Sequence, residues 1–143
     1  MPVVASFVMT SWDLSMEAVW ADVDRGWVWR DGGPYYGVPI SNFLGWLLTA
    51  YVFYQLFAFY LRERAPVPAR ASHWRLAILF YALTALGNLL MIAPSSLGNV
   101  FVDATGKRWM IANILWTSRL VSVFLLMPLS LIAWFKIAKV ADE

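Results

Sequence analysis

The stretch Ile40-Ser-Asn-Phe-Leu-Gly-Trp-Leu-Leu-Thr-Ala-Tyr-Val-Phe-Tyr-Gln-Leu-Phe-Ala-Phe-Tyr-Leu61 contains no charged residue. As a helix rising about 1.5 Å per residue, it would be about 33 Å long, which is enough to cross the hydrocarbon core of a bilayer. The stretch therefore predicts a transmembrane helix over residues 40–61.

Two further apolar stretches predict transmembrane helices over 74–93 and over about 109–135. The first ends at Pro94, and its Arg75 lies in the first turn, where a long side chain can reach the headgroups. Arg119 lies near one end of the predicted 109–135 span. These stretches favour three crossings of the membrane.

The N-terminal segment differs from the three predicted spans. Its apolar run from Val3 to Met9 is too short to cross a bilayer, and Asp13 and Glu17 follow it. Pro2 suits the first turn of a helix. We therefore expect an amphipathic or partly inserted helix over residues 2–20.

The composition supports a membrane protein. Hydrophobic residues make up 61% of the 143 residues and charged residues only 14%, so a soluble enzyme, a disordered tail and a nucleic-acid-binding module are excluded. The chain has no Cys and one His, and we expect no metal site. The predicted fold is a single all-α membrane domain over 1–143, with three transmembrane helices, the N-terminal helix and an aromatic Gly/Pro-rich loop.

The distribution of Arg and Lys predicts the topology in an inner, cytoplasmic or intracytoplasmic membrane. The 62–73 loop, which Pro66 and Pro68 interrupt, and the C-terminus carry basic residues and are expected to be cytoplasmic. The acidic N-terminal region and the 94–108 loop are expected to lie outside.

Small residues form a stripe along the predicted 40–61 helix. Ser41, Gly45 and Thr49 are spaced four apart, and such a stripe lets helices approach closely in lipid, although it can also arise by chance. Phe53 and Phe57 continue roughly the same face. We expect the stripe to pack against a helix and the two phenylalanines to contact a neighbouring helix, a lipid or an apolar pigment.

Asp13 and Glu17 are four residues apart, so they share one face of the N-terminal helix. Paired carboxyl groups can supply a general acid and a general base, because burial raises the pKa of one of them. The alternative is a solvated polar face on an interfacial helix.

An ordered motif runs through residues 11–46. Ser11-Trp12-Asp13-Leu14 is followed by an aromatic stretch, and then by Gly33-Pro34-Tyr-Tyr36-Gly37-Val-Pro39-x-x-Asn42-Phe43-x-Gly45-Trp46. This pattern resembles the carotenoid biosynthesis protein family, which includes membrane carotenoid hydratases of the bisanhydrobacterioruberin and γ-carotene hydratase type. The resemblance covers mainly residues 11–61. Members of the family are longer than this chain, and the motif lies in their C-terminal half.

The resemblance implies a chemistry. A hydratase protonates a terminal C=C bond to a tertiary carbocation and then delivers water, which calls for an acid, a group that positions water and an aromatic wall. By residue type, Asp13 would be the acid, Asn42 would position water, and Tyr36 and Trp46 would form the wall. The sequence departs from the family at Ala18, where a proline is expected.

The resemblance leads to three candidate functions. The first is a non-catalytic accessory subunit that packs against a larger pigment-bearing membrane complex, such as a photosynthetic reaction centre with its light-harvesting antenna. The alternative is a carotenoid hydratase that works as an oligomer or with a separately encoded other half. Binding of a carotenoid or a lipid without chemistry is a third. The expected partners are membrane lipids, other membrane subunits and a carotenoid, with no nucleic acid; the expected cofactor is a non-covalently bound carotenoid or other pigment.

Overall fold

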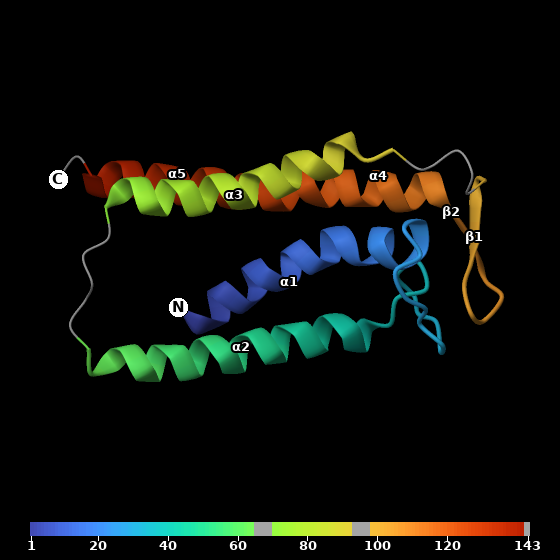
Figure 1. Ribbon diagram of the computed structural model, residues 1–143, viewed down its shortest axis with the longest axis horizontal. Coiled ribbons are helices and arrows are strands. Elements are labelled where there is room, and N and C mark those ends of the chain that lie inside the picture. Colours follow the sequence, from blue (N-terminus) through green and yellow to red (C-terminus); the bar gives the residue numbers. More distant parts are fainter. Residues whose placement is uncertain (65–69, 93–97, 142–143) are drawn as a thin grey trace.

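The computed structural model describes residues 1–64, 70–92 and 98–141, and it is mostly helical (Figure 1). Two widened π-helical segments and one short hairpin complete the architecture. In chain order the elements are α1 (Pro2–Ala18), η1 (Val19–Val23), α2 (Ile40–Arg62), α3 (Ala71–Leu90), β1 (Val100–Val102), β2 (Arg108–Met110), α4 (Ile111–Val121), η3 (Ser122–Leu126) and α5 (Met127–Ala141). The predicted breaks at Pro66, Pro68 and Pro94 lie outside the described residues.

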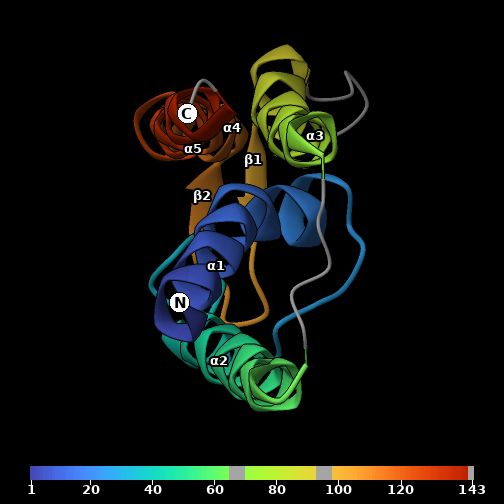
Figure 2. The same ribbon diagram turned by 90° about the vertical axis from the view of Figure 1, so that its left-hand side faces the viewer.

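Helix α1 lies in the middle of the molecule. Figures 1 and 2 place α2 on one side of it and α3, α4 and α5 on the other. The helix buries Ser6, Ser15 and Glu17, whereas Val4 and Phe7 are exposed, so its apolar side chains do not form the buried stripe of a surface helix. Whether α1 is partly inserted or lies on the membrane stays a prediction.

Two helices are long and apolar enough to cross a membrane. They are α2 and the continuous helix Ile111–Ile137, and they correspond to the predicted spans over 40–61 and about 109–135. The third predicted span, 74–93, is a helix at Ala71–Leu90, but His73, Arg75 and Asn88 reduce its apolar character. A third crossing is therefore not confirmed and stays a prediction.

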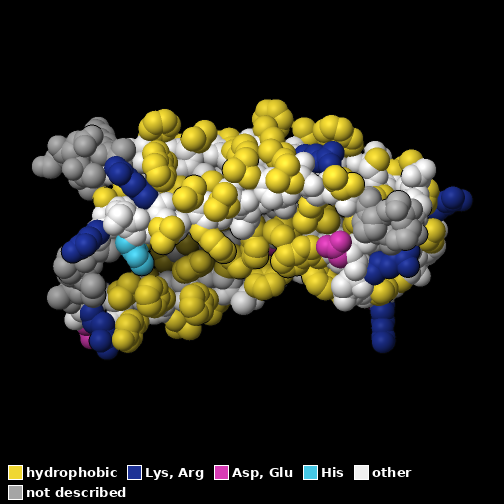
Figure 3. Space-filling view, turned by 45° about the horizontal axis from the view of Figure 1, so that its top comes forward, with side chains coloured by type: hydrophobic (Ala, Val, Ile, Leu, Met, Phe, Trp, Pro, Cys, Tyr) yellow, Lys and Arg dark blue, Asp and Glu magenta, His cyan; other side chains and the backbone are white. Residues whose placement is uncertain are grey.

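The outer surface of the helices is apolar. Figure 3 shows hydrophobic side chains over most of one face, with Lys and Arg mainly towards its two ends. Phe124 is 75% exposed and Phe80 is 72% exposed. An apolar surface of this extent needs lipid or protein to cover it, and together with the two candidate spans it supports a membrane protein.

The end of α2 and the start of α3 lie at one end of the molecule in Figure 1, and the aromatic loop and the hairpin lie at the other, whereas α1 begins away from the hairpin. Which end faces the cytoplasm stays a prediction.

The sequence predicts a loop over 94–108, and the described part of this segment includes two short strands. Residues 100–110 form an antiparallel hairpin in which Phe101 pairs with Trp109. The carboxylate of Asp103 organises its turn, accepting hydrogen bonds from the hydroxyl and the backbone N–H of Thr105 and from the backbone N–H of Lys107. Hydrogen bonds from Thr105 and Lys107 to Asp103 hold the turn, and each strand has only three residues. Strands this short give no clear alternation of apolar and polar residues in the sequence.

A buried polar cluster joins three helical segments. The amide of Asn88 on α3 donates to the hydroxyl of Ser15 on α1 at 3.1 Å and to that of Ser122 on η3 at 2.9 Å. The widened turn of η3 precedes Pro128, which lacks the N–H that a regular helix would require there. The cluster fixes the rotation of α1 against the other helices.

The aromatic loop between η1 and α2 closes through a tight turn at Tyr35–Val38. Tyr36 and Gly37 at its centre both have positive φ, at 54° and 91°, the geometry of a type I′ turn. Gly33 faces this turn so closely that a Cβ atom there would overlap the carbonyl of Val38. Gly33 is therefore required for the loop to close.

We predict that Gly33→Ala destabilises the protein, because the added methyl group cannot fit beside the backbone of Val38. The expected cost is about 1–3 kcal/mol, the usual range for overpacking. Thermal unfolding in detergent would measure it as a lower midpoint temperature. Gly87→Ala on α3 is the control, since nothing lies within 4 Å of its added Cβ atom. Equal midpoints for the two variants would contradict the prediction.

Candidate functional site

Two carboxyl groups and one amide meet where α1 and α2 lie side by side. Asp13 and Glu17 come from the C-terminal half of α1, on the same face as their spacing predicts, and Asn42 comes from the first turn of α2. The amide Nδ2 of Asn42 donates to Oδ2 of Asp13 at 3.2 Å. The structure thus brings together Asp13 and Asn42, the two residues that the family resemblance singled out for catalysis.

Glu17 is held by two tryptophans of the aromatic loop. The indole N–H groups of Trp27 and Trp29 both donate to Oε1 of Glu17, at 2.9 Å and 3.0 Å. Glu17 is only 4% exposed. An indole N–H can only donate, so both bonds suit an acceptor-only carboxylate oxygen.

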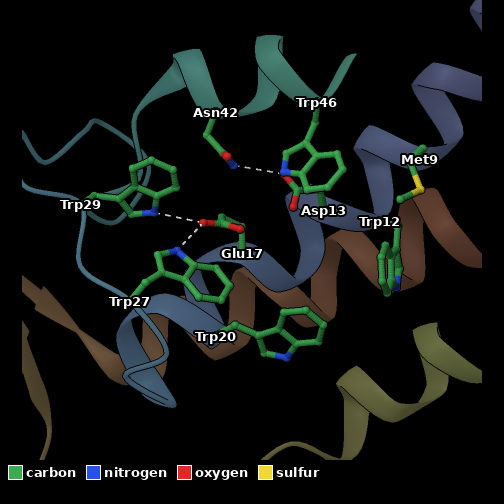
Figure 4. Close-up of a pocket in the computed structure, with 9 residues that line it drawn as sticks. All are labelled: Met9, Trp12, Asp13, Glu17, Trp20, Trp27, Trp29, Asn42 and Trp46. Carbon is green, nitrogen blue, oxygen red and sulfur yellow. Dashed lines mark hydrogen bonds between the residues drawn. The ribbon is translucent and has the colours of Figure 1, made fainter. Parts of the chain in front are cut away.

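The two carboxyl groups lie in a pocket with mostly aromatic walls (Figure 4). The pocket has a volume of about 440 Å³. Its walls come from α1, η1, the aromatic loop and α2: Met9, Trp12, Asp13, Glu17, Trp20, Trp27, Trp29, Asn42 and Trp46. No Lys or Arg is among these residues. An apolar wall around two acids is the setting in which a carboxyl group retains its proton near neutral pH.

Asp13 titrates near neutrality. Burial of its carboxyl group, and after that the negative charge of Glu17, raise the pKa of Asp13 from its ordinary 3.8 to about 7; the hydrogen bond from Asn42 opposes this rise. α1 is not one of the two membrane-spanning candidates. Asp13 can therefore hold a proton and release it close to neutral pH.

Two other acids lie behind this pocket. Burial, and then the charges of Asp103 and Glu17, raise the pKa of Asp22 to about 7. Its Oδ2 atom is buried and has no hydrogen-bond partner within the described part of the chain. Burial acts in the same direction on Asp103, but hydrogen bonds from Thr105, Trp109 and Lys107 outweigh it and lower the pKa of Asp103 to about 2. Only Asp13 of these three acids lines the pocket.

Of the two residues predicted as the aromatic wall, Trp46 lines the pocket and Tyr36 does not. The hydroxyl of Tyr36 contacts Thr117 and the carbonyl of Asn113 on α4, and its ring packs edge-on against Trp109. Tyr36 thus lies outside this pocket, and a role for its ring in a carotenoid-binding wall stays a prediction.

The stripe of Ser41, Gly45 and Thr49 does not pack against another helix within the described chain. It lines a second hollow of about 390 Å³, which shares Trp29, Asn42 and Trp46 with the first, and nothing lies within 4 Å of a Cβ atom built at Gly45. The face of α2 towards α1 carries Ala50 instead, its only buried residue. Packing of the stripe against another helix therefore stays a prediction.

Phe53 and Phe57 lie farther along α2, away from the carboxyl groups. They are 65% and 49% exposed, respectively, and neither lines the two hollows beside Trp46. Contact of these rings with a carotenoid or a lipid stays a prediction.

Four further tryptophans line the pocket that were not predicted as site residues. Trp27 and Trp29 were interpreted only as part of an aromatic loop, yet both bind Glu17. Their spacing of two was the available signal, because alternate residues of an extended chain point to the same side. Trp12 and Trp20, whose rings meet edge-on at 6.1 Å, form the wall on the α1 side.

Comparison with known proteins gives one match. A family model described as carotenoid biosynthesis protein matches residues 1–106, which include α1, the aromatic loop, α2, α3 and the first strand of the hairpin. The match is wider than the 11–61 segment that carries the motif. No curated protein and no solved structure matches the chain.

The raised pKa values predict that stability falls as the pH rises. Between about pH 4 and pH 7, the folded chain holds protons on Asp13 and Asp22 that the unfolded chain, with ordinary values of 3.8, has lost. Folding is therefore favoured most at the acidic end of this range. We expect the unfolding midpoint temperature to decrease from pH 5 to pH 8.

Asp13→Asn and Asp22→Asn should each make this pH dependence shallower, and the double variant should flatten it most. Asp24→Asn is the control, at an exposed position in the same segment. A midpoint temperature that rises with pH in the unaltered protein, or a slope that Asp13→Asn leaves unchanged, would contradict the assignment.

Proposed function

The chain belongs to the carotenoid biosynthesis protein family, and from this we propose that it adds water across the terminal double bond of an acyclic carotenoid end. The observation that carries the proposal is the acid pair, Asp13 and Glu17, in a tryptophan-walled pocket. An isoprenoid end group is apolar and fits such walls, and its activation requires only a proton and a water molecule.

The first step in this proposal is protonation by Asp13. The carboxyl proton of Asp13 bonds to the less substituted carbon of the terminal C=C, using the π electrons, and its neighbour becomes a tertiary carbocation. The negative charge left on the Asp13–Glu17 pair and the π faces of the tryptophan rings stabilise the cation. A pKa near 7 suits Asp13 to this step, because the acid is protonated and still able to donate at neutral pH.

Water then completes the reaction. Its oxygen bonds to the carbocation, and the resulting oxonium gives one proton back to the carboxylate pair, which restores the starting state. The product carries one added hydrogen and one added hydroxyl group, so no oxidant or other reactant is consumed. Asn42, which binds Asp13, is the amide nearest to this position and serves to orient the water.

We predict that Asp13→Asn abolishes hydration while leaving the fold intact, because the amide has a similar shape but no acidic proton. The rate should fall by about 10²–10⁴-fold, the usual contribution of a general acid. The assay supplies an acyclic carotenoid in detergent or vesicles and detects the hydroxylated product by chromatography and mass. Asp24→Asn, an exposed position, is the control. Full activity of Asp13→Asn would overturn the proposal.

A second candidate function is the accessory subunit of a larger pigment-bearing membrane complex. The specific observation in its favour is the stripe on α2, where a Cβ atom at Gly45 meets nothing within 4 Å. A smooth face of small residues is suited to close approach by a helix of another protein. Ala18, in place of the family's proline, also favours a chain whose original activity has been lost.

We predict for this candidate that the chain purifies in mild detergent with a pigmented complex at fixed stoichiometry. Gly45→Leu should release it, since the leucine would hold the partner helix away. Gly87→Leu on α3 is the matched control, because its Cβ position is equally open. Purification of the chain alone, with hydration activity, would exclude the subunit function and leave the enzyme.

A further inference from the structure

We propose that Trp27 and Trp29 are positioning residues that hold Glu17 as a carboxylate, so that the one proton shared by the acid pair resides on Asp13. This inference rests on the proposed function, because it explains which of the two acids is the donor. Trp27 and Trp29 of the aromatic loop then do more than line the pocket.

The geometry of the two indoles is specific to an ionised partner. Both N–H groups point at the same atom, Oε1 of Glu17, from 2.9 Å and 3.0 Å (Figure 4). Hydrogen bonds to a charged acceptor are roughly twice as strong as those between neutral groups. Two of them on one buried oxygen stabilise the carboxylate form of Glu17 over its acid form.

Among the residues that the structure describes, no cation that lines the pocket supplies this stabilisation. The titratable groups that face Glu17 are Asp13 on α1 and Asp22 on η1, and both would add negative charge. Asp103 in the hairpin acts on Asp22, α2 contributes only the neutral Asn42, and no Lys or Arg lines the pocket in the described ranges. The indole N–H groups therefore replace the cation that would otherwise accompany a buried carboxylate.

The two carboxyl groups accept different numbers of hydrogen bonds. Glu17 receives two indole N–H bonds, whereas Asp13 receives one longer bond, at 3.2 Å, from an amide. A single proton shared by the pair goes to the acid whose charged form is less well stabilised. Asp13 is that acid, and it also borders Asn42 and Trp46 in the pocket.

The test compares Trp27→Phe/Trp29→Phe with the unaltered protein by infrared titration of the protonated carboxyl C=O band in detergent. Phenylalanine keeps an aromatic wall and removes the N–H donors. The unaltered protein should show a carboxyl C=O band that titrates near pH 7, and this band should be absent from the Asp13→Asn variant. In the double variant, its midpoint should rise by about one pH unit, because loss of the donors disfavours the doubly ionised pair.

The control is Trp20→Phe, which alters the same pocket at an indole without a hydrogen bond to Glu17 and should leave the midpoint unchanged. The hydration rate of the double variant should fall about tenfold or more, since the carboxylate pair that remains after Asp13 gives up its proton has lost two N–H donors. If the double variant does not fold, Trp27→Phe and Trp29→Phe alone should each give a smaller upward shift.

The two proposals fail in different ways. An unchanged or lowered midpoint in the tryptophan variants would overturn the positioning role, whatever the activity. A titrating band that depends on Asp13 and on both tryptophans, in a protein without hydration activity, would support the positioning role and overturn the proposed function.

Discussion

The structure depends on one electrostatic constraint, which is that two carboxyl groups share a pocket without a cation among the described residues. Asp13 and Glu17 lie within reach of each other on α1, and the wall around them is largely tryptophan. Burying one uncompensated charge is costly, and burying two like charges is more so. Three N–H donors and one retained proton resolve the conflict, and each donor comes from a different position of the segment between residues 27 and 42.

This constraint explains why so much of the chain serves to place α1. From α3, Asn88 binds Ser15 and Ser122 and sets the rotation of α1. From the aromatic loop, the hydroxyl of Tyr35 binds the carbonyl of Leu14 at 2.8 Å, one residue from Asp13. A small rotation of α1 would direct the carboxyl groups away from the N–H donors of Trp27, Trp29 and Asn42. The buried polar bonds thus specify a position for the acids as well as adding stability.

The sequence predicts the helices well and the site in part. Uncharged stretches and their lengths place α2 and the Ile111–Ile137 helix, and the spacing of four places Asp13 and Glu17 on one face. Contacts that depend on the tertiary path of a loop were not predictable: the bonds of Trp27 and Trp29 to Glu17, and the turn of Tyr36 towards α4. Both follow from positive φ angles and close backbone approaches in the loop, which periodicity does not encode.

The open shape of the site is compatible with chemistry on a molecule much longer than the pocket. A cavity of about 440 Å³ holds the end of a carotenoid and not its whole length. The remaining polyene is as apolar as the lipid around it, so it needs no enclosure and can lie along the exposed rings of α2, where Phe53 is 65% exposed. Only the carbocation at the end has to be kept from bulk water. A small, aromatic, acid-bearing pocket would therefore meet the requirement that the proposed reaction imposes, and a partner on the stripe of α2 would close the second hollow without altering the acid pair.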